Sequence, residues 1–438
     1  MHYDVIVCGG GISGVAAAVS AAREGKQVLL LERSGMLGGL ATGGSVSILM
    51  SSLRWFSGFG KELIDSLVAE GSAWRIPDPA VKGFDYYPND PEAMKLRLEH
   101  LVDEAGVELF LYTTLCLAKT ENGRITGITF TFGGRNYDAE ASVYIDTTGD
   151  GSLCRLAGEA LLDGDVDGNV QAPTMVSRYS GIDFNRYEAF LQTYEDGKRP
   201  AKINMIHDLV PKAVEAGILK HIDLHHPGIF RYLPDSDGGI MNAGHVYGAD
   251  VFTPKGLTAA TLEGRRQANA LLKFYKTYIP GFENATLTNT GELALRESGR
   301  VVCEYMVTFE DKTNYQKFSD GIMRFDGGAV SDVHASSGSP EAYRAYVKLY
   351  ADRENVRRDD WAELPYRCLL PKQNSNLLVA GRCAGADRRA MGQIRLQSYC
   401  ASMGQVAGVA AAMAEHGNVK TLDVLALQRR LRTLGVEV

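Results

Sequence analysis

The sequence predicts an α/β fold in which a parallel-sheet domain is built from both ends of the chain and an α+β domain is inserted between them. Three observations predict it. Strand, glycine-rich loop, helix and strand follow one another in residues 3–32. A buried strand and an alanine-rich helix return in residues 376–414, and the segment between these ends is richer in tyrosine and histidine. Because alternating strands and helices are typical of a parallel sheet covered by helices, we expect one discontinuous domain with a second domain inside it.

The first unit is the most regular part of the pattern. Residues 4–8 are expected to form a strand, 9–14 a glycine-rich loop, the alanine-rich stretch to about residue 23 a helix, and 27–32 a second strand. Together they make one βαβ unit.

The later elements follow from hydrophobic periodicity and turn residues. We expect helices at 91–105, 258–278, 340–353 and 396–414, and strands at 107–111, 142–145 and 376–380 with two short strands around a turn at 121–124. The segment 381–392 is expected to be a loop. The expected domain segments are 1–154 and 365–438 for the first domain and 155–364 for the inserted, substrate-binding domain.

Composition excludes several classes of protein. The 438 residues carry a formal net charge of −7 without a long run of either sign, which disfavours nucleic acid as a partner. The seven cysteines are scattered without a CxxC pair, which is typical of reduced thiols in a cytoplasmic protein and offers no zinc or iron–sulfur spacing. The apolar stretch at 406–413 is far shorter than the roughly 20 residues of a membrane span, and no signal leader is readable.

The strongest chemical signal is a GxGxxG fingerprint between the first strand and the first helix. Gly9 permits the tight turn, Gly11 lets a pyrophosphate approach the backbone, and Gly14 lets helix and strand pack closely. Glu32 ends the second strand, where a carboxylate accepts hydrogen bonds from an adenosine ribose. This context predicts a Rossmann-like dinucleotide-binding domain for NAD or FAD.

The segment after Glu32 favours FAD over NAD. Residues 34–44 form a second glycine-rich stretch at a point where an ordinary NAD domain begins its next helix. A longer ligand needs more backbone beside it, so FAD is the expected cofactor.

At this point the chain resembles the FAD-dependent oxidoreductases related to the fumarate reductase and succinate dehydrogenase flavoproteins, within the glutathione-reductase-like FAD folds. The resemblance rests on residues 9–32, on Leu37-Gly38-Gly39, on residues 145–151, and on the closing run from 364 to 408. The middle of the chain matches more loosely, through residues 295–300, which look like the family's Arg-Glu-x-x-Arg segment.

The resemblance implies where FAD lies. Gly38 and Gly39 would pass beside the pyrophosphate and ribityl chain, Gly149 would lie near the adenosine, and the 381–392 loop would run beside the flavin. A helix beginning near Arg395 would direct its positive N-terminus at the flavin pyrimidine. The expected cofactor-binding residues are Gly9, Gly11, Ser13, Gly14, Glu32, Arg33, Gly38, Gly39, Thr42, Gly149, Asp150, Gly381 and Arg395. Because residues 35–47 contain no histidine or cysteine, FAD is expected to bind without a covalent bond.

The candidate catalytic residues come from the middle domain and the last loop. Relatives often carry a histidine in the loop after the last strand, but residues 386–390 contain none, so Arg388 or Arg389 either binds an anionic group or is merely solvated. The middle domain offers a group of histidines and tyrosines followed by two arginines: His225, His226, Tyr232, His245, Tyr247, Arg296 and Arg300. The predicted catalytic set is Arg296, Arg300, His245 and Arg388, and no metal site is expected.

These observations predict an enzyme that transfers a hydride between flavin N5 and a small polar organic substrate. No second GxGxxG lies in a strand–helix context, so electrons come from or go to a substrate, dioxygen, a quinone, a diffusing nicotinamide or a protein partner. Two alternatives stay open: an electron-transfer subunit acting with a partner protein, and a redox-neutral isomerase or dehydratase. A tRNA-modifying flavoprotein is disfavoured by the acidic balance, and a homo-oligomer is left open.

Overall fold

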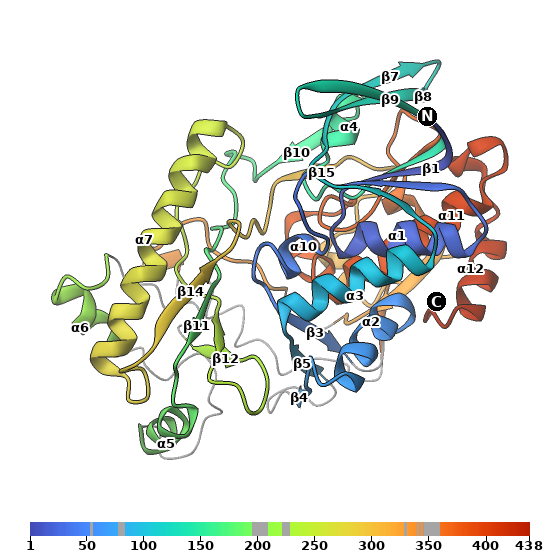
Figure 1. Ribbon diagram of the computed structural model, residues 1–438. Coiled ribbons are helices and arrows are strands. Elements are labelled where there is room, and N and C mark those ends of the chain that lie inside the picture. The colour runs from blue at the N-terminus through green and yellow to red at the C-terminus, as the bar shows by residue number, and fades with distance from the viewer. Residues whose placement is uncertain are drawn as a thin grey trace.

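The computed structural model describes residues 1–52, 56–77, 84–194, 209–220, 228–327, 331–339, 341–342, 345 and 360–438. Two regions can be seen in Figure 1. One contains both termini and a large sheet with helices α1, α3 and α11 beside it, and the other is built along the long helix α7.

The parallel part of the large sheet combines strands from both ends of the chain. Its order is β6 (Glu108–Phe110), β2 (Val28–Leu31), β1 (His2–Cys8), β9 (Arg135–Asp146) and β18 (Leu377–Val379). Each neighbouring pair is parallel, with Val7 opposite both Leu30 and Ile145, and Leu378 also opposite Ile145. The predicted α/β fold with a Rossmann-like sheet is therefore confirmed.

The same sheet continues into an antiparallel part beyond β9. β7 (Thr114–Glu121) and β8 (Arg124–Phe132) form a hairpin, and β8 pairs with the first half of β9 while the second half of β9 lies in the parallel sheet. The turn predicted at residues 121–124 connects β7 to β8.

Side chains alternate between the two faces of the parallel sheet. Val5 and Val7 face one core together with α1 (Ile12–Arg23), α3 (Pro91–Glu104) and α11 (Gln397–Met413). Ile6 and Cys8 face the other core, together with β8 and α4 (Ser152–Leu156). This burial on both faces explains why the strands read as continuous apolar runs.

Helices α1 and α11 pack closely because glycines lie at their contact. A Cβ on Gly404 would lie 2.1 Å from the Ser13 carbonyl oxygen, and one on Gly408 would lie 2.2 Å from that of Ala17. Helix α11 is thereby held against the first half of α1.

Shorter elements complete this region. They are α2 (Gly58–Ala69), β3 (Ile48–Ser52), β4 (Ile76–Pro77), β5 (Phe84–Pro88), β10 (Leu161–Asp163), β15 (Gly299–Val301), α8 (Phe309–Thr313), β16 (Gly321–Phe325), β17 (Ala362–Pro365), α10 (Arg388–Ile394) and α12 (Val424–Thr433). Among the described residues, 3₁₀ turns lie at Gly39–Ala41, Tyr366–Leu369, Glu415–Gly417 and Val419–Thr421. Because Ile322, Phe325 and Leu364 are buried in the same core as α1, residues before the expected boundary at 364 pack with the first domain. The division at 154 and 364 stays a prediction.

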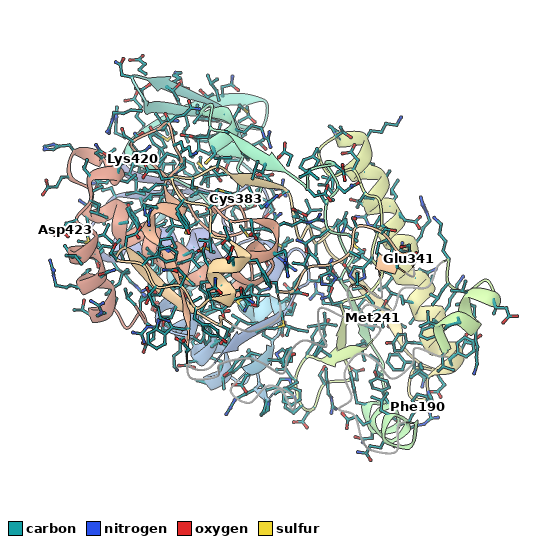
Figure 2. The ribbon with its side chains drawn as sticks, turned by 180° about the vertical axis from the view of Figure 1, so that it is seen from behind. Phe190, Met241, Glu341, Cys383, Lys420 and Asp423 are labelled. Atoms are coloured by element: carbon teal, nitrogen blue, oxygen red, sulfur yellow. The ribbon has the colours of Figure 1, made fainter. Side chains whose placement is uncertain are left out.

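The second region is a small antiparallel sheet covered by helices. The sheet order is β12 (Ile229–Arg231), β13 (Gly239–Met241), β11 (Ser177–Ser180) and β14 (Thr286–Thr290). A separate core joins it to α5 (Phe184–Tyr194), α6 (Leu209–Glu215) and α7 (Pro254–Tyr278) through residues such as Tyr179, Phe274 and Tyr275. Figure 2 labels Met241 and Phe190 in this region, and Cys383 and Asp423 in the other.

Two expected elements differ from the structure. The segment expected to be the loop 381–392 contains the start of α10, because the Asp387 side chain accepts a hydrogen bond from Ala390 N and caps a helix. Arg395 ends α10 rather than beginning the next helix, α11, which starts at Gln397. The helix expected at 340–353 lies almost wholly outside the described residues. Among the described helices, none has the length and apolar content to cross a bilayer.

Candidate active site

The first glycine loop is shaped by contacts that leave no room for side chains. Gly9 has φ +106°, and a Cβ there would lie 2.6 Å from the Thr147 carbonyl oxygen at the end of β9. A Cβ on Gly14 would lie 1.7 Å from the Gly9 carbonyl oxygen. These two glycines allow the loop, α1 and β9 to pack against one another.

The N-terminus of α1 is open. Gly11 is the N-cap, no side chain caps it, and no atom lies within 4 Å of the position of a Cβ there. The Ser13 hydroxyl oxygen is buried and has no hydrogen-bond partner in the described part of the chain. Backbone N–H groups at such a terminus attract anions. The N-terminus of α1 therefore combines free space, backbone N–H donors and the Ser13 hydroxyl that lacks a hydrogen bond.

The second glycine stretch lies directly against the first. Gly38 and Gly39 have φ values of +100° and +54°, and Gly38 N donates to Gly10 O at 2.8 Å. A Cβ on Gly39 would lie 3.2 Å from Gly11 Cα. We call these two loops, residues 9–14 and 37–42, the glycine cradle. Thr42 is buried beneath it, where its hydroxyl donates to Leu37 O at 2.5 Å and supports the second loop.

Glu32 lies at the edge of the glycine cradle. Its two carboxylate oxygens accept hydrogen bonds from Gly10 N and Ser34 N, each at 2.7 Å. Each oxygen keeps further lone-pair capacity, so the carboxylate is oriented and still able to accept a ribose hydroxyl. The neighbouring Arg33 is exposed, with Nη2 3.8 Å from the Glu292 carboxylate.

The C-terminal segment approaches the cradle through Gly381 and Arg382. Gly381 has φ +88°, and a Cβ there would lie 3.1 Å from the Ser13 Cβ. Arg382 lies against Gly149, where a Cβ would be 2.8 Å from Nη2, and donates to the Ser298 hydroxyl at 2.6 Å. Burial by itself would raise the pKa of Asp150, but hydrogen bonds from Ser152 and Thr148 and the charge of Arg382 outweigh it and lower the pKa.

These observations fit FAD. The uncapped N-terminus, the buried Ser13 hydroxyl and the space over Gly11 suit a pyrophosphate, and the oriented Glu32 carboxylate suits a ribose. The structure thus brings together most of the expected cofactor-binding residues, although their contacts with FAD stay a prediction.

Arg300 and Arg388 gather around one buried carboxylate. Glu297 Oε2 lies 3.0 Å from Arg388 Nε, and its Oε1 lies 3.6 Å from Arg300 Nη2. Arg388 also pairs with Asp165 at 2.7 Å, while Arg300 donates to Gly164 O at 2.6 Å. Burial lowers the pKa of Arg300. Both guanidinium groups are thus engaged with the protein, and a catalytic role for either stays a prediction.

Arg389 differs from its neighbour. Its guanidinium lies over the Phe309 ring, 3.5 Å from the ring centroid. This geometry is a cation–π contact between α10 and α8.

Arg296 and His245 are brought together by the segment around Thr174. Thr174 forms isolated bridges with both His245 and Ala294, and Arg296 Nη1 donates to the Thr174 hydroxyl at 2.6 Å and to Ala172 O at 2.7 Å. Arg296 and His245 are both buried. Two predicted catalytic residues that are 51 positions apart in the numbering therefore share one site.

A chain of hydrogen bonds starts at His245 and includes two residues that sequence analysis missed. His245 Nε2 lies 2.8 Å from His334 Nδ1, and His334 Nε2 lies 2.9 Å from Asp332 Oδ1. Asp332 Oδ2 pairs with Arg395 at 2.8 Å. We call His245, His334 and Asp332 the histidine relay. It places histidines next to α10, although the loop after the last strand has none.

The charges of the histidine relay are biased by burial and by arginine. Burial and the Arg296 guanidinium hold the pKa of His334 well below the usual imidazole range. Burial by itself would raise the pKa of Asp332, but its contacts with His334 and the charges of Arg395 and Arg296 outweigh it and hold that pKa well below the usual range. Asp332 is therefore ionised and His334 neutral near pH 7.

The remaining sequence candidates are placed less centrally. Tyr247 stacks on His245 with ring centroids 5.9 Å apart. Burial raises the pKa of Tyr232, so its hydroxyl stays protonated at neutral pH. His225 and His226 lie outside the described residues. In the part of the chain that the structure describes, no group of three or more His, Cys, Asp and Glu side chains could hold a metal ion.

The fold and the cradle define a dinucleotide-binding protein of the α/β class. The model of the family described as "FAD dependent oxidoreductase" matches residues 4–431, and the chain belongs to this family. It is accordingly an FAD-dependent oxidoreductase, which confirms the expected enzyme class and FAD as its cofactor. The narrower relation to the fumarate reductase flavoproteins stays a prediction.

Comparison with individual proteins gives weaker likenesses. A digeranylgeranylglycerophospholipid reductase of Methanosphaerula palustris is 27% identical over 166 residues, covering 34% of this chain and 39% of that protein. A thiamine thiazole synthase of Desulfosudis oleivorans is 30% identical over 162 residues, covering 34% of this chain and 57% of that protein. The chain thus matches less than two thirds of the length of either relative.

A solved structure supports the fold over nearly the whole chain. The geranylgeranyl bacteriochlorophyll reductase-like protein of Thermoplasma acidophilum gives a TM-score of 0.50 at 12% identity, covering 99% of this chain and 84% of that chain. At this identity the likeness concerns the fold alone.

Proposed function

We propose that this enzyme binds FAD non-covalently in the glycine cradle and catalyses hydride transfer between flavin N5 and a small polar organic substrate. The observation that carries the proposal is the buried pair of Arg296 and His245. Both contact Thr174, and His245 is connected through His334 and Asp332 to Arg395. A cation and an imidazole in one buried site suit a substrate with a polar group next to the reacting carbon.

FAD, when bound, supplies a centre that accepts or donates two electrons as a hydride. The chain's own residues hold it: the backbone N–H groups of α1 and the Ser13 hydroxyl would bind the pyrophosphate, and Glu32 the ribose. Gly11, where a Cβ would meet no atom within 4 Å, leaves that space free of a side chain, while Gly9 and Gly14 let the loop pack against β9 and α1.

Within the proposed site, Arg296 orients the substrate and His245 moves its proton. Arg300 and Arg388 fix Glu297, whose carboxylate accepts from Gln171 N at 3.0 Å. Gln171 Oε1 in turn accepts from His334 N at 3.0 Å. The two arginines would therefore help to position His334 through Glu297 and Gln171. We assign substrate binding chiefly to the inserted segment 155–364.

The first test is the visible absorption spectrum of the purified protein before and after mild denaturation. We expect oxidised flavin bands and release of FAD into the supernatant, as a dissociable cofactor requires. A colourless protein that also takes up no added FAD would refute the proposal. Flavin that stays with the precipitated chain would refute non-covalent binding alone.

The second test screens small polar alcohols, amines and acids for anaerobic bleaching of the flavin. His245→Asn is expected to slow bleaching by roughly 10²–10⁴-fold, the usual contribution of a general acid or base. The control is His100→Asn, which changes an exposed histidine on α3 that pairs with Glu104. Equal rates in the two variants would contradict the role of His245.

A further inference from the structure

The inserted domain contains a cavity that lies apart from the glycine cradle. Its volume is about 630 Å³, and its walls come from α7, from Val210 on α6 with residues 217–220 after that helix, and from the residues after β13. Figure 1 shows α6 next to α7. Pockets that hold small molecules in proteins have volumes of roughly 300–1,000 Å³, so this cavity is large enough for a ligand. No residue of the cradle is among the described residues that line it.

Apolar side chains form most of the cavity wall. Val210, Leu271 and Phe274 belong to the core of the inserted domain. Ile218 and Leu219 pack against that core while remaining partly exposed. An apolar group that enters the cavity is therefore removed from water, which favours its binding.

The backbone after β13 closes one side of the cavity with little side-chain volume. Ala243 and Gly244 are the lining residues there. Gly244 has φ +85°, and a Cβ at this position would lie 3.3 Å from Leu271 Cδ1 and 3.4 Å from Gln267 Cβ. A larger side chain at position 244 would therefore occupy the space next to α7 that the glycine leaves open.

Charged side chains lie at the solvent end of the cavity. Among its described lining residues, the charged ones are Lys220, Glu263 and Arg266. Lys220 Nζ lies 3.1 Å from Glu263 Oε1, and Arg266 Nη1 lies 3.2 Å from Glu263 Oε2. The two cationic side chains are 75% and 64% exposed, against 21% for the carboxylate. Two cations thus share one carboxylate, which leaves one positive charge in excess.

We propose that this cavity is a second ligand site of the protein, which binds a small amphipathic carboxylate. The apolar part of the ligand lies between α6 and α7, and its carboxylate lies beside Lys220 and Arg266. This site is separate from the FAD site and does not depend on the reaction proposed above. Because ion pairs between exposed side chains contribute little, the two cations can turn from Glu263 to a ligand at small cost.

The number of charges favours a carboxylate over a phosphate monoester. A carboxylate carries one negative charge and neutralises the excess at the solvent end of the cavity. A phosphate monoester carries about −1.5 to −2 at pH 7, and its second charge would lie beside Glu263. The Arg266 guanidinium also offers the planar pair of donors that fits a carboxylate.

The probe is decanoate, a linear aliphatic carboxylate, added to the FAD-loaded protein and followed by isothermal titration calorimetry. We expect saturable binding of one molecule per chain. Ala270 is half-buried on the cavity wall, so Ala270→Phe places a ring in the space of the ligand. It should weaken decanoate binding by at least about tenfold. The matched control is Ala259→Phe, at an exposed position of α7 outside the cavity lining, which should bind decanoate like the unmodified protein.

Two substitutions at the solvent end test the charge. Arg266→Gln should weaken decanoate binding about two- to fivefold, as the loss of an exposed ion pair implies. Glu263→Gln should strengthen it by a similar factor, and such a gain cannot come from misfolding. Binding of 1-decanol, which has no charge, should be the same in both variants. The control is Arg265→Gln, an exposed arginine of α7 outside the cavity lining, which should leave decanoate binding unchanged.

Several results would overturn this inference. The ligand site is refuted if decanoate shows no saturable binding up to about 1 mM, or if Ala270→Phe and Ala259→Phe bind it equally well. The carboxylate assignment is refuted if Arg266→Gln leaves decanoate affinity unchanged, or if decyl phosphate binds more tightly than decanoate. A failure of the proposed hydride transfer has no effect on any of these titrations, so the two ideas are tested separately.

Discussion

Two glycines of the first loop have opposite surroundings although they are three residues apart. A Cβ on Gly14 would collide with the Gly9 carbonyl oxygen at 1.7 Å, whereas a Cβ on Gly11 would meet nothing within 4 Å. Gly14 is therefore required for the packing of α1 against the loop. Gly11 leaves open the space in which we place the FAD pyrophosphate.

This contrast predicts different defects for two similar substitutions. Gly14→Ala should lower the free energy of unfolding of the FAD-free protein by about 1–3 kcal/mol or more, because overpacking forces the backbone to move. Gly11→Ala should change that stability by less than about 1 kcal/mol but weaken FAD binding. Denaturant unfolding and FAD titration measure the two effects. Equal FAD affinity in Gly11→Ala and the unmodified protein would contradict the placement of the pyrophosphate.

Lys312 on α8 is fully buried and titrates abnormally. Burial, opposed by the charge of Asp326 and assisted by Arg389, lowers its pKa to about 8. In the unfolded chain a lysine has a pKa of about 10.4, so between pH 8 and 10.4 the unfolded state binds more protons than the folded state. The contribution of this group to stability therefore rises with pH over that window and is lost as pH falls through 8.

The difference between the unmodified protein and Lys312→Met isolates this effect from buried thiols and phenols, which titrate in the same range. We expect the free energy of unfolding of the unmodified protein to gain on that of the variant by up to about 3 kcal/mol between pH 7 and pH 10.5. Denaturant unfolding at several pH values checks it. A flat difference curve would show that Lys312 has an ordinary pKa in the folded state.

At the scale of secondary-structure elements, the packing of α1 against α11 positions the site. Gly404 and Gly408 let α11 lie on the backbone of α1 beside Ser13 and Ala17. The small residues that the sequence places on this helix are thus explained by a close helix–helix contact. This contact also holds Gly381 and the C-terminal segment at the glycine cradle.

The contact predicts that alanine will be less stable than glycine at position 408 of α11, the reverse of the usual helix propensity. In an unconstrained helix, glycine to alanine stabilises by about 1 kcal/mol. Gly408→Ala should instead destabilise by about 1–3 kcal/mol, because the new methyl group would lie 2.2 Å from Ala17 O. Ala412→Gly, at a half-buried position of the same helix, should show only the ordinary loss of about 1 kcal/mol. Stabilisation by Gly408→Ala, measured by thermal unfolding, would disprove the close contact.

At the scale of the whole molecule, the proposed FAD site joins segments from both ends of the chain. The glycine cradle comes from the N-terminal unit, Gly149 from the segment after β9, and Gly381 from the segment after β18. A ligand that contacts all three ties the sheet together, so FAD binding and folding should be coupled.

The free energy of unfolding should therefore rise with the logarithm of the free FAD concentration. With FAD at about 100 times its dissociation constant, the free energy of unfolding should increase by about 2.7 kcal/mol over the FAD-free protein. Thermal unfolding over a range of FAD concentrations measures it, with Gly11→Ala as the control that should respond less. No dependence on FAD concentration would contradict a dissociable site formed by the folded chain.

Much of the fold could be predicted from the sequence because its signals are local. The βαβ unit, the hairpin turn at 121–124, the strand at 376–380 and the helix at 396–414 all depend on periodicity and turn residues within a few positions. The α10 helix was missed because seven residues give little periodicity and its Asp387 cap lies in an apparent loop. The cofactor fingerprint is likewise local, since Gly9, Gly11, Gly14 and Glu32 lie on one unit.

The sequence by itself determined the parallel-sheet class, the glycine loops and the FAD-dependent oxidoreductase family, because each is encoded by neighbouring residues whose geometry follows from spacing. Only the tertiary structure decided which polar groups share a site. It separated Arg388 and Arg300, engaged with Glu297, from Arg296 and His245, and it brought Asp332 and His334 to them. The physical reason is that a buried hydrogen bond depends on where distant segments meet, and no residue spacing along the chain specifies that meeting point.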